Sequence, residues 1–105
     1  MNNSNYISFV QDKKLIQLHN NEILHIRSAG DYIRIITPER KYITHSTMKN
    51  FAAMVNPNAF VRVHRCFIVN IRKAAIIEDE AVQIGGTLIP ISKTYKAGLL
   101  QWMAG

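Results

Sequence analysis

Apolar and polar residues alternate over many short stretches of the chain, and turn-forming residues separate these stretches. Alternation with a period of two is typical of strands that bury one face. The pattern predicts strands at residues 6–10, 15–18, 23–28, 32–37, 41–44, 71–78, 81–84 and 87–91, and a β-rich stretch at 60–71. Many short strands of this kind predict a mainly β domain, either a sandwich or a barrel.

Two short segments have the spacing of helices instead. The first has one apolar face, with Ser46 as its expected N-cap, and it ends at Asn56-Pro57-Asn58; its apolar residues are Met48, Phe51, Ala52 and Val55. The second follows Ser92, another expected cap, and has Tyr95, Leu99 and Trp102 on its apolar face. Gly85-Gly86 is expected to be a tight hairpin turn.

The length of 105 residues predicts a single domain, which we place at residues 6–105. Residues 1–5 are polar and are expected to be a disordered tail. The chain has 13 Lys and Arg against 7 Asp and Glu, a net charge of +6, which suits a polyanionic partner. Three of the acids form the run Glu78-Asp79-Glu80, which we expect to face away from any such partner.

Several function classes lack support in this sequence. The longest apolar run, Phe51–Val55, is too short to span a membrane, and the first residues do not have the pattern of a signal peptide. The single cysteine, Cys66, excludes an intramolecular disulfide and fits a reducing cytoplasm. The four histidines lack the spacing of metal ligands, so we expect no metal and no cofactor. No catalytic arrangement stands out, so we expect no enzymatic activity and no small-molecule substrate.

The most informative stretch is Phe60-Val61-Arg62-Val63-His64-Arg65-Cys66-Phe67-Ile68-Val69-Asn70. It alternates at first, becomes apolar at Phe67, and holds two arginines and a histidine between buried anchors. A rigid cationic edge of this kind suits a phosphate backbone or the acceptor edge of guanine. The alternative is an ordinary strand with a solvated, charged face.

This stretch resembles the signature of the LytTR family of DNA-binding domains, Phe-x-Arg-Val-His-Arg-x-Phe-Ile-Val-Asn. Other parts of the family pattern follow in order. Glu22–Ile26 with Gly30-Asp31-Tyr32-Ile33 resembles an early strand and its Gly-Asn-Tyr loop, and Tyr42 with Thr47–Phe51 resembles the next strand and helix. Ile89-Pro90-Ile91-Ser92-Lys93-Thr94-Tyr95 resembles the closing Pro-Val-Ser-Arg-x-Tyr. The resemblance runs from about Tyr6 to about Leu100.

The resemblance implies about ten strands in stacked antiparallel sheets with two short helices, and recognition of DNA by loops and strand ends. It implies sequence-specific binding of double-stranded DNA in transcription regulation, as the output domain of a bacterial two-component response regulator. The expected target is a pair of promoter direct repeats that bind this chain and a second copy of it. The alternative function is a protein-interaction β module with a basic surface.

The resemblance also assigns roles to individual residues. Arg65 matches the position that reaches a base edge, and an arginine there can contact guanine with two hydrogen bonds. The alternatives for Arg65 are a phosphate contact and a surface ion pair. Lys93 matches a second contact element, where lysine in place of arginine keeps the charge but loses the planar fork. Ser92 can bind a phosphate or cap the helix, with the cap favoured, and Lys96 can add a phosphate contact.

The remaining assignments concern the first loop and the signature itself. Asp31 stands where the family often has asparagine and can accept from a cytosine amino group, while Arg34 is a candidate phosphate anchor. Tyr32 is expected in the core. The other expectations are a phosphate contact for Arg62, structural hydrogen bonds to the backbone for His64 and Asn70, and a small, partly buried packing role for Cys66, with redox sensing as the alternative.

Overall fold

The computed structural model describes residues 4–105, which form ten strands, two α-helices and two 3₁₀ turns. The strands are β1 (Tyr6–Gln11), β2 (Lys14–His19), β3 (His25–Ala29), β4 (Tyr32–Ile36), β5 (Lys41–His45), β6 (Phe60–His64), β7 (Phe67–Asn70), β8 (Ala74–Ile77), β9 (Ala81–Ile84) and β10 (Thr87–Pro90). The helices are α1 (Met48–Met54) and α2 (Lys93–Ala104), and the 3₁₀ turns are η1 (Asn20–Glu22) and η2 (Ile71–Lys73). The expected mainly β fold with two short helices is confirmed.

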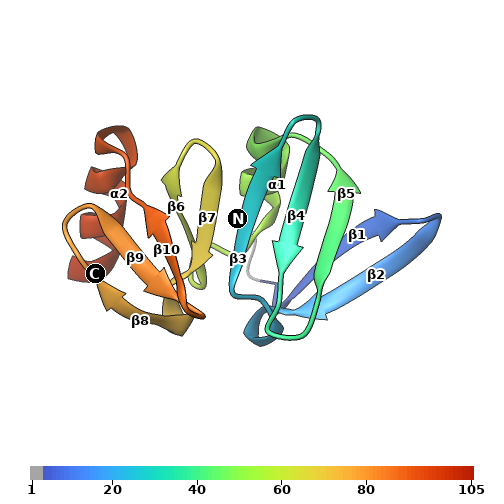
Figure 1. The fold of residues 1–105 in the computed structure, drawn as a ribbon, viewed down its shortest axis with the longest axis horizontal. Coiled ribbons are helices and arrows are strands. Elements are labelled where there is room, and N and C mark those ends of the chain that lie inside the picture. Colours follow the sequence, from blue (N-terminus) through green and yellow to red (C-terminus); the bar gives the residue numbers. More distant parts are fainter. Residues whose placement is uncertain (1–3) are drawn as a thin grey trace.

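Every strand pairing is antiparallel, and the strands form three sheets. A central sheet has the order β5-β4-β3-β7-β6, and it lies between the β1–β2 hairpin and the three-stranded sheet β10-β9-β8 (Figure 1). Helix α1 lies behind β3–β5 in this view, and α2 lies beside the small sheet (Figure 1). The three sheets and α2 follow one another along a molecule whose longest dimension is 40 Å.

The central sheet separates two hydrophobic cores. The first lies among the hairpin, β3–β4 and α1, and it includes Ile7, Phe9, Ile33, Ile35 and Phe51. The second lies among β6–β7, the small sheet and α2, and it includes Val63, Val69, Val82, Ile89 and Leu99. The alternation in the sequence therefore buries different faces of the central sheet at its two ends, and no layer formed by residues 4–105 covers the outer face of β3–β5 (Figure 1).

Two hairpin turns follow the local sequence closely. Gly85 and Gly86 both have positive φ, and Ile84 pairs directly with Thr87, as expected for a two-residue turn. A Cβ at Gly85 would lie 2.6 Å from Leu24 Cδ1, so a larger residue there would displace the end of the Leu24 side chain. The β1–β2 turn adopts the same left-handed geometry at Asp12 and Lys13, without any glycine.

Three local expectations are corrected by the structure. Thr47, and not Ser46, caps α1, because its Oγ1 accepts from the Asn50 amide at 3.1 Å. The expected strand at 71–78 begins with η2 and becomes extended only at Ala74. The expected tail at residues 1–5 is already bonded to the domain at Ser4, whose carbonyl accepts from the side chains of Asn20 and Asn56. Residues 1–3 of that tail lie outside the described residues.

Asn70 connects distant parts of the chain at the end of β7. It is 1% exposed, and its Nδ2 donates to the carbonyls of Asn20 and Ile23 at 3.0 and 2.9 Å. Its Oδ1 accepts from the Arg72 amide at 3.2 Å and so caps η2. These are structural hydrogen bonds to the backbone, as expected for Asn70, and they fix where β7 ends.

Candidate nucleic-acid interface

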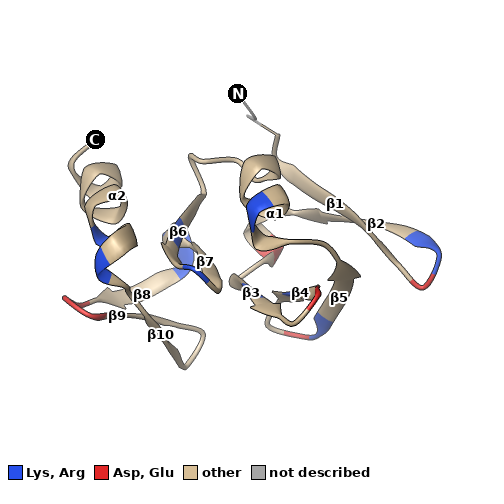
Figure 2. Ribbon diagram, turned by 90° about the horizontal axis from the view of Figure 1, so that it is seen from above, with Lys and Arg blue, Asp and Glu red and all other residues tan. Residues whose placement is uncertain are grey.

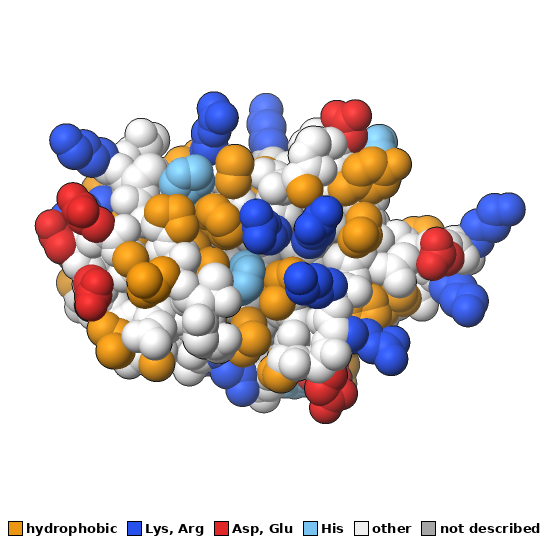
Figure 3. Space-filling model, viewed as in Figure 1, with side chains coloured by type: hydrophobic (Ala, Val, Ile, Leu, Met, Phe, Trp, Pro, Cys, Tyr) orange, Lys and Arg blue, Asp and Glu red, His pale blue; other side chains and the backbone are white. Residues whose placement is uncertain are grey.

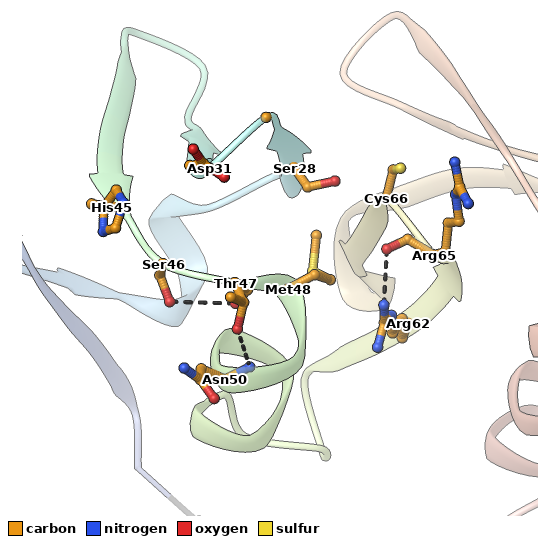
Figure 4. Close-up of a pocket in the computed structure, with 11 residues that line it drawn as sticks. Ser28, Asp31, His45, Ser46, Thr47, Met48, Asn50, Arg62, Arg65 and Cys66 are labelled. Atoms are coloured by element: carbon orange, nitrogen blue, oxygen red, sulfur yellow. Dashed lines mark hydrogen bonds between the residues drawn. The ribbon is translucent and has the colours of Figure 1, made fainter.

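Three connections meet at one end of the central sheet and form what we call the loop edge. They are the β3–β4 turn with Gly30 and Asp31, the β5–α1 junction at 45–50, and the β6–β7 turn with Arg65 and Cys66. Together they line an open cavity of about 610 Å³. Figure 4 shows the cavity, with Asp31 and His45 on one side and Arg65 and Cys66 on the other. The fold thus brings together two segments that the sequence analysis selected separately.

The β6–β7 turn is held by hydrogen bonds on both sides of Arg65. The Cys66 amide donates to His64 Nδ1 at 3.0 Å, and Arg62 Nη2 donates to the Arg65 carbonyl at 2.9 Å. The Ser28 amide on β3 donates to the Cys66 carbonyl at 3.0 Å, which ties the turn to the neighbouring strand. Arg65 itself is exposed, and its side chain extends away from Arg62 (Figure 4). A fixed main chain with an exposed guanidinium is well suited to bind the edge of a base.

Arg62 has an internal role that the sequence analysis did not predict. Its guanidinium carbon lies 4.9 Å from the centre of the Tyr95 ring on α2, in a cation–π arrangement. Its Nε is buried and has no hydrogen-bond partner. Arg62 therefore joins β6 to α2 and holds the Arg65 carbonyl, while the rest of its side chain lines the cavity.

The beginning of α2 lies beside β6, because the Ser92 amide donates to the Val63 carbonyl at 2.9 Å. Ser92 occupies the N-cap position, but its hydroxyl makes no capping bond, so the expected capping bond is wrong. Instead Ser92 Oγ is buried without a partner. Lys93 is exposed at the first position of the helix, where the helix dipole favours anions.

Lys96 is bound to an acid of the run Glu78-Asp79-Glu80. Its Nζ forms an ion pair with Asp79 Oδ1, and the Asp79 side chain is 80% exposed. The acidic run is expected to face away from a polyanionic partner, and this stays a prediction; the ion pair shows that Asp79 lies beside Lys96, one of the candidate phosphate contacts. Figure 2 shows the acidic turn between β8 and β9 below the first turn of α2.

The first loop differs from expectation at Tyr32. Its side chain is 49% exposed and packs edge-on against His45 with ring centres 5.4 Å apart, so the expected core position is wrong. Asp31 is exposed and lines the cavity, and Arg34 is exposed on the outer face of β4. His45 and Asn50 also line the cavity, and the sequence did not identify them as site residues. Their positions, at the end of β5 and in the first turn of α1, follow from the predicted strand and helix.

Two ionisable groups of the central sheet region have shifted pKa values. A hydrogen bond with Ser28 and the neighbouring Arg65 lower the pKa of the Cys66 thiol. Burial, together with Arg27 and Lys41, lowers the pKa of His25 to about 4. Cys66 lies at the loop edge, whereas His25 lies at the opposite end of β3, where it pairs with Ile36. Within residues 4–105, no group of three or more His, Cys, Asp or Glu side chains could hold a metal ion.

The model of the LytTr DNA-binding domain family matches residues 13–104. The chain belongs to this family. It is therefore a DNA-binding domain of the kind used in transcription regulation, and the family is not an enzymatic one. In residues 4–105, no helix combines the length and the apolar character that crossing a membrane requires.

Two relatives of the LytTr domain chain are sensory transduction proteins named LytT, from Bacillus anthracis and Bacillus cereus. Each is 23% identical over 90 residues, which covers 80% of this chain and 37% of the relative. The chain thus spans little more than a third of the length of these relatives. A solved structure of a LytTr DNA-binding domain, from a Bacillus cereus methyl-accepting/DNA response regulator, has a TM-score of 0.82 at 16% identity. The match covers 97% of this chain and 99% of the solved chain, so the two chains share a fold.

Proposed function

We propose that this LytTr domain binds duplex DNA in a sequence-specific manner and that the β6–β7 turn reads bases. The observation that supports this most is the state of Arg65. Its carbonyl and the next residue's amide and carbonyl are all hydrogen bonded, while its side chain is exposed at the rim of the loop edge. An arginine positioned in this way can donate two hydrogen bonds to guanine in the major groove.

Other residues at this end of the molecule would supply contacts that set position and register. We assign phosphate contacts to Lys93, whose side chain is exposed at the start of α2, and to Arg34 on β4. Ser92 Oγ has no partner but is buried, so it would have to become exposed before donating to a phosphate, and Lys96 would first have to leave Asp79. Asp31 could accept from a cytosine amino group, because a carboxylate is repelled by phosphates.

The regulatory setting is a further part of the proposal. The relatives are sensory transduction proteins more than twice as long as this chain, so we propose that the domain is the output unit of a two-component response regulator. We propose that two copies occupy direct repeats in one promoter. A chromosomal target would place the protein in the bacterial cytoplasm.

The test is a binding-site selection from random duplexes, followed by affinity measurements at several salt concentrations. If about five phosphates are neutralised, log K should fall with log salt at a slope of about −4 to −5. Arg65→Ala should lose about 1–3 kcal/mol on the selected site and relax the preference at one base position. Arg72→Ala is a matched control, because Arg72 is also exposed but lies in η2, beyond the opposite end of β7.

Two results would count against this proposal. No enriched sequence and a salt slope near zero would favour the alternative, a protein-interaction module with a basic surface. Normal affinity and unchanged base preference in Arg65→Ala, with normal folding, would remove Arg65 from the base-reading role.

A further inference from the structure

The outer face of β3–β5 carries a pair of arginines that the loop edge does not include. Arg27 on β3 and Arg34 on β4 lie directly opposite each other in the strand register, and both are exposed. We call this pair the basic row. Figure 3 shows Lys and Arg side chains gathered over β3 and β4 on this face, with the visible Asp and Glu side chains at its margins.

Like charges directly opposite each other on a sheet destabilise it, and no acid compensates the basic row. Among residues 4–105, the only ion pair joins Lys96 to Asp79, and neither arginine takes part in it. Arg27 packs over the Phe67 ring at 5.5 Å, which orders its stem without neutralising its charge. Lys41 adds a third cation to the same face. It lies opposite Ile36, and Ile36 is two residues from Arg34 on β4 and therefore shares its face.

A buried histidine lies on the same strand as Arg27, two residues before it. His25 is 5% exposed, and its Nδ1 has no hydrogen-bond partner. Burial, and after it the charges of Arg27 and Lys41, lower its pKa to about 4, so it stays neutral at physiological pH. The face therefore favours an anion, and the protein itself does not provide one.

The distance from the basic row to the loop edge suggests what that anion is. Arg27 precedes Ser28, which lines the cavity, and Arg34 is separated from Asp31 by only two residues. Residues two apart on a strand face are about 7 Å apart. The major groove of DNA is about 12 Å wide, so a loop that enters it has a phosphate strand at about this distance on each side.

Resting on the proposed function, we infer that Arg27 and Arg34 together form a phosphate-binding row for the DNA strand that borders the groove entered by the loop edge. Bound phosphates would neutralise the repulsion between the two arginines. The pair would thus reduce the stability of the free domain and contribute affinity, without base preference, to the complex. An acidic protein surface would suit the charge as well, but only a duplex would also be placed there by the neighbouring loops.

The test compares Arg27→Gln, Arg34→Gln and the double variant with Arg72→Gln as the matched control, since glutamine keeps the apolar stem and removes the charge. For each, the affinity for a selected duplex is measured over a range of salt concentrations beside a melting curve. We expect several-fold weaker binding, a salt slope smaller by about 0.9 per arginine, and unchanged base preference. We also expect melting temperatures at or above that of the wild type, because the like-charge repulsion is removed.

A second arm locates the contact on the DNA. Single neutral methylphosphonates are placed at successive positions of each strand, and one position should remove the affinity difference between wild type and Arg34→Gln. If both variants keep the wild-type affinity and slope while Arg65→Ala loses base preference, the inference is overturned and the proposed function stands. If Arg65→Ala also keeps the wild-type affinity and base preference, the proposed function is contradicted, and with it the inference that rests on it.

Discussion

The guanidinium of Arg62 donates to the main-chain carbonyl of Arg65 at 2.9 Å, so one arginine of the signature positions the other. The same guanidinium stacks on Tyr95, which carries this restraint across to α2. The β6–β7 turn and the beginning of α2 are therefore connected through a single side chain.

Arg62→Ala should weaken DNA discrimination without removing a direct base contact. Loss of the hydrogen bond and the cation–π contact should lower the free energy of unfolding by about 1–3 kcal/mol. The base position that loses preference should be the same one that Arg65→Ala affects. A double-mutant cycle of Arg62→Ala with Arg65→Ala checks this, since two independent contacts would have additive effects and a positioning residue would not.

Asp79→Asn should strengthen DNA binding, because it releases Lys96 and removes a negative charge near α2. The ion pair is largely solvent-exposed and should contribute less than about 1 kcal/mol to stability. We expect a nearly unchanged melting temperature and a steeper salt slope, and both effects on DNA should vanish in the background Lys96→Gln. Glu80→Gln is the control, since it removes the same charge from the same turn without freeing Lys96. Equal gains in both variants would show that Lys96 makes no contact and that only long-range repulsion was relieved.

Asn70→Ala should strongly destabilise the fold. The change removes the side-chain partners of the Ile23 carbonyl and the Arg72 amide at a site that is almost fully buried, and it removes one of the two donors to the Asn20 carbonyl. Each unsatisfied buried group costs about 1–3 kcal/mol, so we expect a total loss of at least about 2 kcal/mol. Chemical denaturation measures the loss, and Asn58→Ala is a control at an exposed asparagine. A loss below about 0.5 kcal/mol would contradict the structural role, since surface substitutions have effects of that size.

The stability of the domain should decrease as the pH falls from about 6.5 toward 4. His25 has a folded pKa of about 4 and an unfolded value of 6.5, so the unfolded state binds more protons between these values. Stability therefore rises with pH in this window, and the full contribution of about 3 kcal/mol is present above 6.5. Urea denaturation of wild type and His25→Gln at pH 7 and pH 4.5 checks this. An equally steep loss in His25→Gln would assign the pH dependence to other groups.

Much of the fold follows from local sequence. Alternating residues predicted most strands within one or two positions, with β8 as the exception, because a strand with one buried face needs that pattern wherever it lies in the sheet. Gly85-Gly86 predicted the β9–β10 turn, because glycine adopts positive φ without strain. His64 and Asn70 make hydrogen bonds to residues within two positions, so short-range chemistry was enough to suggest their roles.

Two expectations that the structure corrects also depend on local sequence. Ser46 and Thr47 are both good caps, and the choice depends on which of them has extended backbone when the helix begins. A pattern of alternation does not reveal the 3₁₀ turn at 71–73. Its one apolar residue, Ile71, packs in the second core and so continues the apolar pattern of the preceding strand.

The sequence by itself determined the strand order along the chain, the basic character, and the family signature with Arg65 at its centre. Only the tertiary structure decided which faces are covered, and with them the surroundings of each charge. Tyr32 is exposed because nothing packs over the outer face of β4, and Lys96 is paired because the β8–β9 turn reaches α2. Arg27 and Arg34 become neighbours only through strand register. Contacts of this kind join residues far apart in the chain, so they depend on the packing of whole sheets and leave no pattern in the local sequence.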